Sequence, residues 1–201
     1  MKKRMLHVGC GPQLLRGWIN IDNQPYKGID AVVDIRNGIP YEKLDFIFAE
    51  HFIEHLAFDD AQQFLRDCRR ALAKDGVLRL TTPNLDWVWL TQYHPGEWKQ
   101  ASEAVRDCFW MNKAFRGWGH QFLYNAQTLT ECLHDAGFDT IEPQRYGESR
   151  YEELRGIERH EQYPDAHLPH IIIVEASGIR RGKSDALEGP MREFKEALAV
   201  V

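Results

Sequence analysis

Short apolar runs alternate with polar stretches along most of the chain. These runs predict strands at 5–9, 18–22, 30–34, 45–49, 77–81, 138–146 and 170–176. Near-continuous apolar runs of this length are typical of a parallel sheet that is covered on both faces. Because helical patterns separate several of these strands, the sequence predicts βαβ units and an α/β fold.

A helical period occupies two of the intervals between the strands. Residues 59–74 place apolar side chains at spacings of three and four, which makes one apolar stripe. Asp59 or Asp60 is expected to cap the start of this helix, and Gly76 to end it in the left-handed conformation. Residues 126–136 predict a second helix, again with a glycine shortly after its last turn.

The link between the first two strands is too short for an ordinary helix. Only 13 positions separate Gly9 from Asp22, against about 20 in a dinucleotide-binding fingerprint. A parallel crossover usually takes at least about 10–12 residues. We therefore expect a helix of about one turn around residues 13–15.

Three segments fall outside this alternation. Residues 84–124 are rich in aromatic side chains and predict a helical insertion, either with a local core or as a wall or lid over a pocket. Residues 147–169, rich in Glu, Arg and His, are expected to form an exposed loop or hairpin. Residues 180–201 predict a C-terminal tail that docks weakly or frays. We therefore expect one domain over residues 1–179, followed by the tail.

Composition places the chain among soluble globular proteins, and we expect it in the cytoplasm. Apolar residues make up 43% and charged residues 27% of the sequence, and neither a membrane span nor a secretory signal is visible. The net charge of −5 argues against a nucleic-acid partner. The cysteines form no CxxC pair, so we expect reduced thiols. The oligomeric state stays open.

A glycine turn follows the first predicted strand. Gly9, Cys10 and Gly11 allow the backbone to turn sharply and to approach a ligand closely. Leu14 stands where a dinucleotide fingerprint has its third glycine. The turn therefore favours a ligand without a pyrophosphate.

Two carboxylates follow strands at the edge where such sheets bind ligands. Asp22 can accept hydrogen bonds from both hydroxyls of a ribose, each worth roughly 1.5–3 kcal/mol. The alternative is a turn made by Asp22 and Asn23. Asp34 can accept from an adenine amino group while the N–H of Ile35 contacts the ring. The alternative for Asp34 is a cap at the strand end.

The segment after the fourth strand reads EHFIEHL and contains HxxEH, the motif order of inverted zinc peptidases. We expect no metal here for two reasons. No third ligand stands out among the remaining histidines, and the motif follows a strand of a predicted sheet that has nucleoside-binding features. Glu50 and His51 are instead expected at the far end of the nucleoside ligand. His55 is expected to begin the next helix.

Together, the segments LHVGCG, GWINID, DFIFAEHFIEHL and LRDCRRALAKDGVLRLTTPN resemble class I methyltransferases that depend on S-adenosylmethionine (SAM). The resemblance runs from about residue 6 to residue 176 and is strongest to short bacterial members with GWxNxD after a shortened first helix. It implies a Rossmann-like sheet, mostly parallel with an antiparallel last strand, and helices on both faces.

The resemblance also implies where SAM binds. It places the glycine turn at the methionine moiety, Asp22 at the ribose, Asp34 with Ile35 at the adenine, and Glu50 with His51 beside the methionine group. His7 stands where the family often has an acidic residue. The residues assigned to the cofactor are His7, Gly9, Cys10, Gly11, Asp22, Asn23, Asp34, Ile35, Glu50 and His51.

The expected activity is methyl transfer from SAM to a small-molecule or sugar-like acceptor. Such a transfer is an in-line displacement, in which the protein mainly aligns the acceptor and excludes water. For a hydroxyl acceptor, the candidate bases are His51, His120 and Tyr124. The alternatives are a protein that binds SAM or a nucleoside without catalysis and a zinc hydrolase that uses HxxEH.

Overall fold

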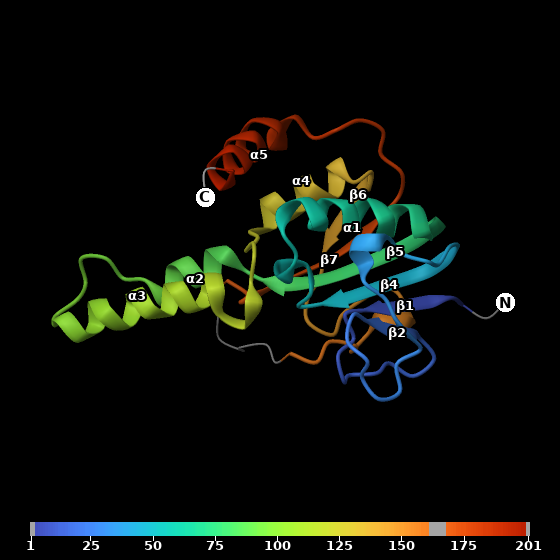
Figure 1. Ribbon diagram of the computed structural model, residues 1–201, viewed down its shortest axis with the longest axis horizontal. Helices are drawn as coiled ribbons and strands as arrows, with labels where there is room; N and C mark the ends of the chain where they lie inside the picture. The colour runs from blue at the N-terminus through green and yellow to red at the C-terminus, as the bar shows by residue number, and fades with distance from the viewer. Residues whose placement is uncertain (1–2, 161–167, 200–201) are drawn as a thin grey trace.

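A seven-stranded mixed sheet organises the chain, of which the computed structural model describes residues 3–160 and 168–199. The strands are Met5–Val8 (β1), Ile19–Asp22 (β2), Ala31–Val32 (β3), Leu44–Glu50 (β4), Leu72–Pro83 (β5), Thr140–Pro143 (β6) and Ile171–Ser177 (β7). Their order in space is β3-β2-β1-β4-β5-β7-β6 (Figure 1). Neighbours from β3 to β5 are parallel, whereas β7 is antiparallel to both β5 and β6. The expected Rossmann-like α/β sheet with an antiparallel last strand is therefore confirmed.

The α-helices divide into a covering layer and an arm. They are Phe58–Ala71 (α1), Leu85–Gln92 (α2), Ala101–Arg116 (α3), Ala126–Asp135 (α4) and Asp185–Leu198 (α5). α1, α4 and α5 lie on one side of the sheet, whereas α2 and α3 extend away from it beyond the carboxyl end of β5 (Figure 1). We call α2 and α3, residues 85–116, the arm. The arm lies within the segment where the sequence predicts a helical insertion.

The two faces of the sheet are covered in different ways. On the helix face, Leu6, Ile47 and Leu78 belong to the main apolar core together with residues of α1 and α4. The other face is covered by the link between β1 and β2 and by the 3-10 helix Glu152–Leu154 (η4), whose Leu154 clusters with Phe48. Within the described ranges, η4 is thus the helix that packs on this second face.

A buried ion cluster fastens the segment after β6 to this second face. Arg79 of β5 is fully buried, and its guanidinium lies 2.5 Å from carboxylate oxygens of both Glu158 and Glu175. A buried guanidinium is tolerated only when it is paired in this way. The cluster therefore sets the position of residues 158–160. Residues 161–167 of the expected 147–169 loop lie outside the described residues.

The expected one-turn helix after β1 is wrong. Residues 9–18 contain turns but no helix. The side chain of Asn20 holds this link, because its Oδ1 accepts from the N–H of Leu15 at 2.8 Å and its Nδ2 donates to the Leu15 carbonyl at 3.0 Å. An amide that pairs with the backbone in this way competes with helix formation.

The expected cap and stop of α1 are also wrong. The helix begins at Phe58 with no side-chain cap, so Asp59 and Asp60 lie within its first turn. It ends at Ala71, and Gly76 belongs to β5 without a left-handed conformation. A Cβ on Gly76 would lie 2.6 Å from the carbonyl oxygen of Leu44, so this glycine permits close approach of β5 to β4.

Residues 185–198 of the expected tail form α5, which packs on the domain. Met191 and Phe194 contact the main core, and Ser184 donates a 2.6 Å hydrogen bond to Glu131 of α4. Lys195 pairs with Asp59 of α1 at 2.5 Å. Among the described residues, we find no helix with the length and apolar character that crossing a bilayer requires.

Candidate functional site

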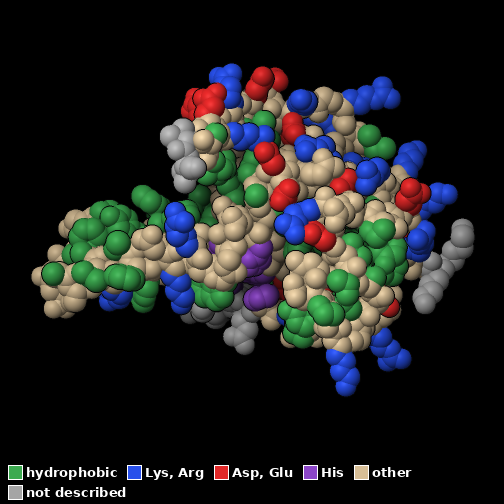
Figure 2. All heavy atoms as spheres, viewed as in Figure 1, with side chains coloured by type: hydrophobic (Ala, Val, Ile, Leu, Met, Phe, Trp, Pro, Cys, Tyr) green, Lys and Arg blue, Asp and Glu red, His purple; other side chains and the backbone are tan. Residues whose placement is uncertain are grey.

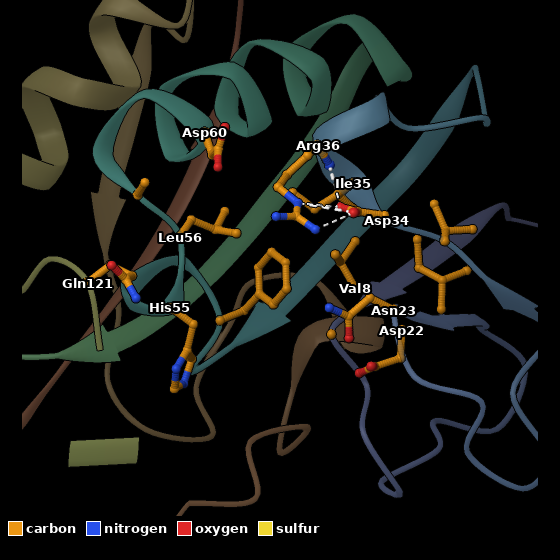
Figure 3. A pocket seen from close by; sticks show the side chains of 15 residues that line it. Val8, Asp22, Asn23, Asp34, Ile35, Arg36, His55, Leu56, Asp60 and Gln121 are labelled. Carbon is orange, nitrogen blue, oxygen red and sulfur yellow. Dashed lines mark hydrogen bonds and ion pairs between the residues drawn. The ribbon is translucent and has the colours of Figure 1, made fainter. Parts of the chain in front are cut away.

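A pocket of about 280 Å³ opens at the carboxyl ends of β1 and β2 (Figure 3). We call it the sheet-edge pocket. It is lined by Val8, Gly9, Ile21, Asp22, Asn23, Val33, Asp34, Ile35, Arg36, Phe52, His55, Leu56, Ala57, Asp60 and Gln121. Asp22 and Asn23 lie on one side of it, and His55 and Gln121 on the other (Figure 3). The structure thus brings together five residues that the sequence assigns to the cofactor: Gly9, Asp22, Asn23, Asp34 and Ile35.

The glycine turn needs its glycines for two separate reasons. Gly9 and Gly11 have φ values of 63° and 51°, which disfavour residues with a Cβ. A Cβ on Gly9 would also lie 2.3 Å from Cδ2 of Phe52. Cys10 between them is buried, and burial raises the pKa of its thiol to about 11. Cys10 and Gly11 therefore shape the turn but do not line the sheet-edge pocket.

Asp22 braces the glycine turn. Its Oδ2 accepts from the N–H of Gly11 at 2.8 Å, and its Oδ1 accepts from the N–H of Gln24 at 2.9 Å. An ionised carboxylate has about four lone-pair positions, so two remain for further donors. Asp22 is half-buried and lines the pocket, which leaves those positions within reach of a diol.

Asp34 is engaged by Arg36, a residue that the sequence analysis did not single out. Its Oδ1 accepts from the backbone N–H of Arg36 at 3.0 Å and so caps the 3-10 helix Ile35–Asn37 (η1). The guanidinium of Arg36 pairs with the same carboxylate at 2.5 Å, and this hydrogen bonding lowers the pKa of Asp34 (Figure 3). The signal in the sequence is the spacing of two residues, since an N-cap side chain bonds the N–H of residue i+2.

Glu50 and His7 lie away from the sheet-edge pocket. The Glu50 carboxylate accepts from the N–H groups of Arg159 and His160 at 2.8 and 3.1 Å. The ring of His7 is buried on the second sheet face and stacks on Phe48 with ring centroids 5.3 Å apart. Burial lowers the pKa of His7. In this structure, neither side chain lines the pocket that contains Asp22.

A second pocket of about 400 Å³ lies where the arm joins the sheet. We call it the aromatic pocket. It is lined by His51, Pro83, Trp87, Val88, Gln92, Trp110, Lys113, Ala114, Trp118, His120, Leu123, His170 and Ile171. Two candidate bases, His51 and His120, therefore lie in one pocket, although 69 positions separate them in the sequence. The third, Tyr124, is fully buried and lines neither pocket.

His51 occupies a strained position at the end of β4. Its φ of 46° is uncommon for a residue with a side chain and is a feature that clusters at functional sites. Nδ1 of His51 lies 3.1 Å from Oε1 of Glu54, and Nε2 is buried without a hydrogen-bond partner among the described residues. A nitrogen in this state is available to a ligand in the aromatic pocket.

The two pockets meet at a pair of histidines. His55 lines the sheet-edge pocket, His120 lines the aromatic pocket, and their ring centroids are 5.1 Å apart. Figure 2 shows histidine side chains gathered where the arm meets the body of the molecule. A ligand in one pocket therefore lies next to a ligand in the other.

Comparison with known proteins places the chain in a family. Residues 2–142 match the family model described as a methyltransferase domain. A search of curated protein sequences finds no match.

Solved structures with similar folds include SAM-dependent methyltransferases from Thermotoga maritima and Archaeoglobus fulgidus. Both are 15% identical to this chain with a TM-score of 0.54; the alignments cover 88% and 87% of this chain and 82% and 85% of theirs. The methyltransferase domain of the citrinin polyketide synthase is also similar, with 15% identity, a TM-score of 0.52 and 89% coverage of this chain, which spans only 47% of that one. The SAM-dependent methyltransferases among these structures share its fold, and the family match shows that the chain belongs to the methyltransferase-domain family.

Proposed function

We propose that this enzyme methylates a hydroxyl group of a small-molecule or sugar-like acceptor that binds in the aromatic pocket. The observation that carries the proposal is the contact between the two pockets at His55 and His120. A polar pocket at the strand ends suits the cofactor, and an adjoining pocket with aromatic walls suits a small acceptor.

The residues of the sheet-edge pocket fit the nucleoside part of SAM. The free lone pairs of Asp22 face the ribose diol, with Asn23 beside them. Ile35 presents its N–H to the adenine, and Asp34 with Arg36 forms the adjoining polar wall. Gly9 lines the same pocket, and its lack of a side chain lets the Phe52 ring pack against the turn, so the methionine part would lie beside Gly9 and Phe52.

The aromatic pocket offers stacking surfaces and few charges. Trp87, Trp110 and Trp118 line it, and flat rings of this kind bind sugar faces and planar molecules with a large contact area. Lys113 is the one Lys or Arg among the residues that line it. This composition favours a neutral or weakly acidic acceptor over a polyanion such as nucleic acid.

SAM supplies an electrophilic methyl group on a sulfonium, which an acceptor oxygen takes by in-line displacement. His51 receives the proton of the acceptor hydroxyl on Nε2, the nitrogen that has no other partner. Oε1 of Glu54 lies 3.1 Å from Nδ1 of the same ring, so its charge would stabilise the ring once the ring carries the proton. The aromatic walls exclude water and align the acceptor, which is the main contribution of a protein to this reaction.

The proposal is tested by a methyl-transfer screen with labelled SAM against metabolite and carbohydrate pools. We expect label in a small hydroxyl compound and a fall in kcat of about 100-fold in His51→Ala, the low end for loss of a general base. His134→Ala is the control, because His134 of α4 lines neither pocket and should leave kcat unchanged. Binding of S-adenosylhomocysteine (SAH) without transfer to any pool would contradict the proposed acceptor class.

We further propose that the enzyme works in the cytoplasm. All four cysteines are free thiols, and Cys108 of the arm is exposed. Exposed free thiols are typical of proteins in a reducing compartment. Fractionation of the producing cells with an antibody to this chain would test the location.

A further inference from the structure

Three side chains with metal-ligand atoms converge where the two pockets meet. They are Glu54 and His55 of the 3-10 helix Ile53–His55 (η2) and His120, which follows the arm. One ligand atom from each lies within 4.8 Å of the others. No third ligand for the HxxEH segment stands out in the sequence, because only the fold brings His120 close to it.

Backbone hydrogen bonds hold the three residues together. The carbonyl oxygen of Glu54 accepts from the N–H of Gln121 at 2.7 Å and from the N–H of Phe122 at 3.3 Å. The N–H of His55 donates to the carbonyl of Phe52 at 3.1 Å and closes η2. The main chain therefore presents the three ligands before any ion binds.

The carboxylate of Glu54 is buried and only half satisfied. Glu54 is fully buried, and its Oε2 accepts from Oγ1 of Thr82 at 3.0 Å. Its Oε1 makes no hydrogen bond, because Nδ1 of His51 is close to it but poorly aligned. A buried carboxylate oxygen without a donor is costly, and a bound cation is one way to satisfy it.

His120 is already oriented as a ligand. Its Nδ1 lies 2.7 Å from the carbonyl oxygen of Ala114, so Nδ1 carries the hydrogen and donates it. Nε2 is then the nitrogen with a free lone pair. A backbone carbonyl that fixes the ring in this way is the usual outer partner of a metal-binding histidine.

We propose that Glu54, His55 and His120 bind one divalent transition-metal ion, with Zn²⁺ as the best match. Two imidazoles and one carboxylate are the donor set of catalytic zinc sites, which keep a fourth position open. Tetrahedral bonds of about 2.0–2.1 Å place ligand atoms about 3.3 Å apart. The present separations therefore need only a small closure, which the exposed side chain of His55 can supply by rotation.

The role of the ion rests on the proposed function. Because His120 lines the aromatic pocket, the open position faces the site proposed for the acceptor. An acceptor oxygen bound there would be held beside the sheet-edge pocket, and the positive charge would favour loss of its proton to His51. The metal thus selects acceptors with an oxygen that can bind it.

The test measures Zn²⁺ binding to the full chain after treatment with a chelator. We expect one Zn²⁺ per chain by calorimetry and by competition with a chromogenic chelator, and visible Co²⁺ absorption of the tetrahedral type. His55→Ala and His120→Ala should each weaken binding at least about tenfold. These variants are preferable to changes at Glu54, whose burial makes misfolding a risk.

His134→Ala is the matched control, because His134 Nδ1 also lies close to a backbone carbonyl, that of Phe138 at 3.0 Å, but His134 is outside the cluster. No Zn²⁺ binding, or equal binding by wild type and both ligand variants, would overturn the proposal. SAH binding by the wild type is measured in parallel. SAH binding without Zn²⁺ binding refutes only the metal, whereas Zn²⁺ binding without SAH binding refutes only the assignment of the sheet-edge pocket.

Discussion

The sheet-edge pocket and the aromatic pocket adjoin, but the chain builds them by different means. The first consists of turns at the strand ends, held by short hydrogen bonds such as those between Asp22 and Gly11 and between Asp34 and Arg36. The second depends on the arm, which leaves large apolar side chains such as Phe109 and Leu90 mostly exposed. The sheet therefore fixes the pocket proposed for the cofactor, whereas the pocket proposed for the acceptor depends on an attached unit.

The arm is organised around a polar residue rather than a core of its own. Asp107 of α3 is buried and accepts from Nε1 of Trp98 at 2.9 Å and from Nδ1 and the N–H of His94 at 3.0 and 3.1 Å. The hydrogen bond from Trp98 is the largest cause that lowers the pKa of Asp107 to about 2. On the proposed function, we therefore expect changes to the aromatic side chains of the arm to alter acceptor binding more than SAM binding.

Among changes expected to affect only one of the two pockets, Asp22→Ala should have the largest effect. The change removes both the acceptor for the ribose and the brace of the Gly11 N–H. Loss of a charge-assisted hydrogen bond costs roughly 1.5–3 kcal/mol, so SAH affinity should fall by about 10- to 100-fold in calorimetry. Asp75→Ala, which removes an exposed carboxylate near the start of β5, should leave SAH affinity unchanged. An unchanged affinity in Asp22→Ala would remove Asp22 from the cofactor site.

A smaller effect, on the acceptor and not on SAH, is expected from Trp110→Ala. Trp110 lines the aromatic pocket, so its loss should raise KM for the acceptor about tenfold, equal to about 1.4 kcal/mol, and leave SAH affinity within about twofold. Trp89→Ala is the matched control, since Trp89 is a tryptophan of the same arm that is 54% exposed and lies outside this pocket. Equal effects of the two variants on KM would show that the arm does not form the acceptor site.

The same contrast explains how far the sequence could predict the molecule. Strands, α4 and the glycine turn follow from residues close in sequence, and the structure contains them. The link after β1 was mispredicted, because the side chain of Asn20 replaces a helix there. The spacing of two residues indicates the backbone cap at Asp34, but not that the guanidinium of Arg36 pairs with the same carboxylate.

The aromatic pocket could not be predicted from the sequence. It combines His51 after β4, the arm and residues next to β7, so only the folded topology assembles it. The burial of Tyr124 and the hydrogen bonds from the N–H groups of Arg159 and His160 to Glu50 also depend on residues far apart in the sequence. Aromatic content left open whether the segment has a local core or forms a pocket wall, and it did not indicate which side chains would form such a wall.

The smallest expected effect concerns His7, which the family resemblance assigns to the cofactor but which lies in the second sheet face. Burial lowers its pKa below the ordinary 6.5, and the hydrogen bond that its Nδ1 donates to Oδ1 of Asn20 opposes this only in part. The folded state therefore binds fewer protons than the unfolded chain between the folded pKa and 6.5. Stability from the neutral ring is present above pH 6.5 and is lost as the pH falls through that window.

His7→Phe retains an aromatic ring against Phe48 and removes the titrating group. Between pH 7.5 and 5.5, the free energy of unfolding of the wild type should fall further than that of His7→Phe, by up to about 1.4 kcal/mol in urea titrations. SAH affinity at pH 7.5 should be the same in both proteins, the reverse of the result expected for Asp22→Ala. Parallel pH dependences together with weaker SAH binding in His7→Phe would instead place His7 in the cofactor site and extend that site through the sheet to its second face.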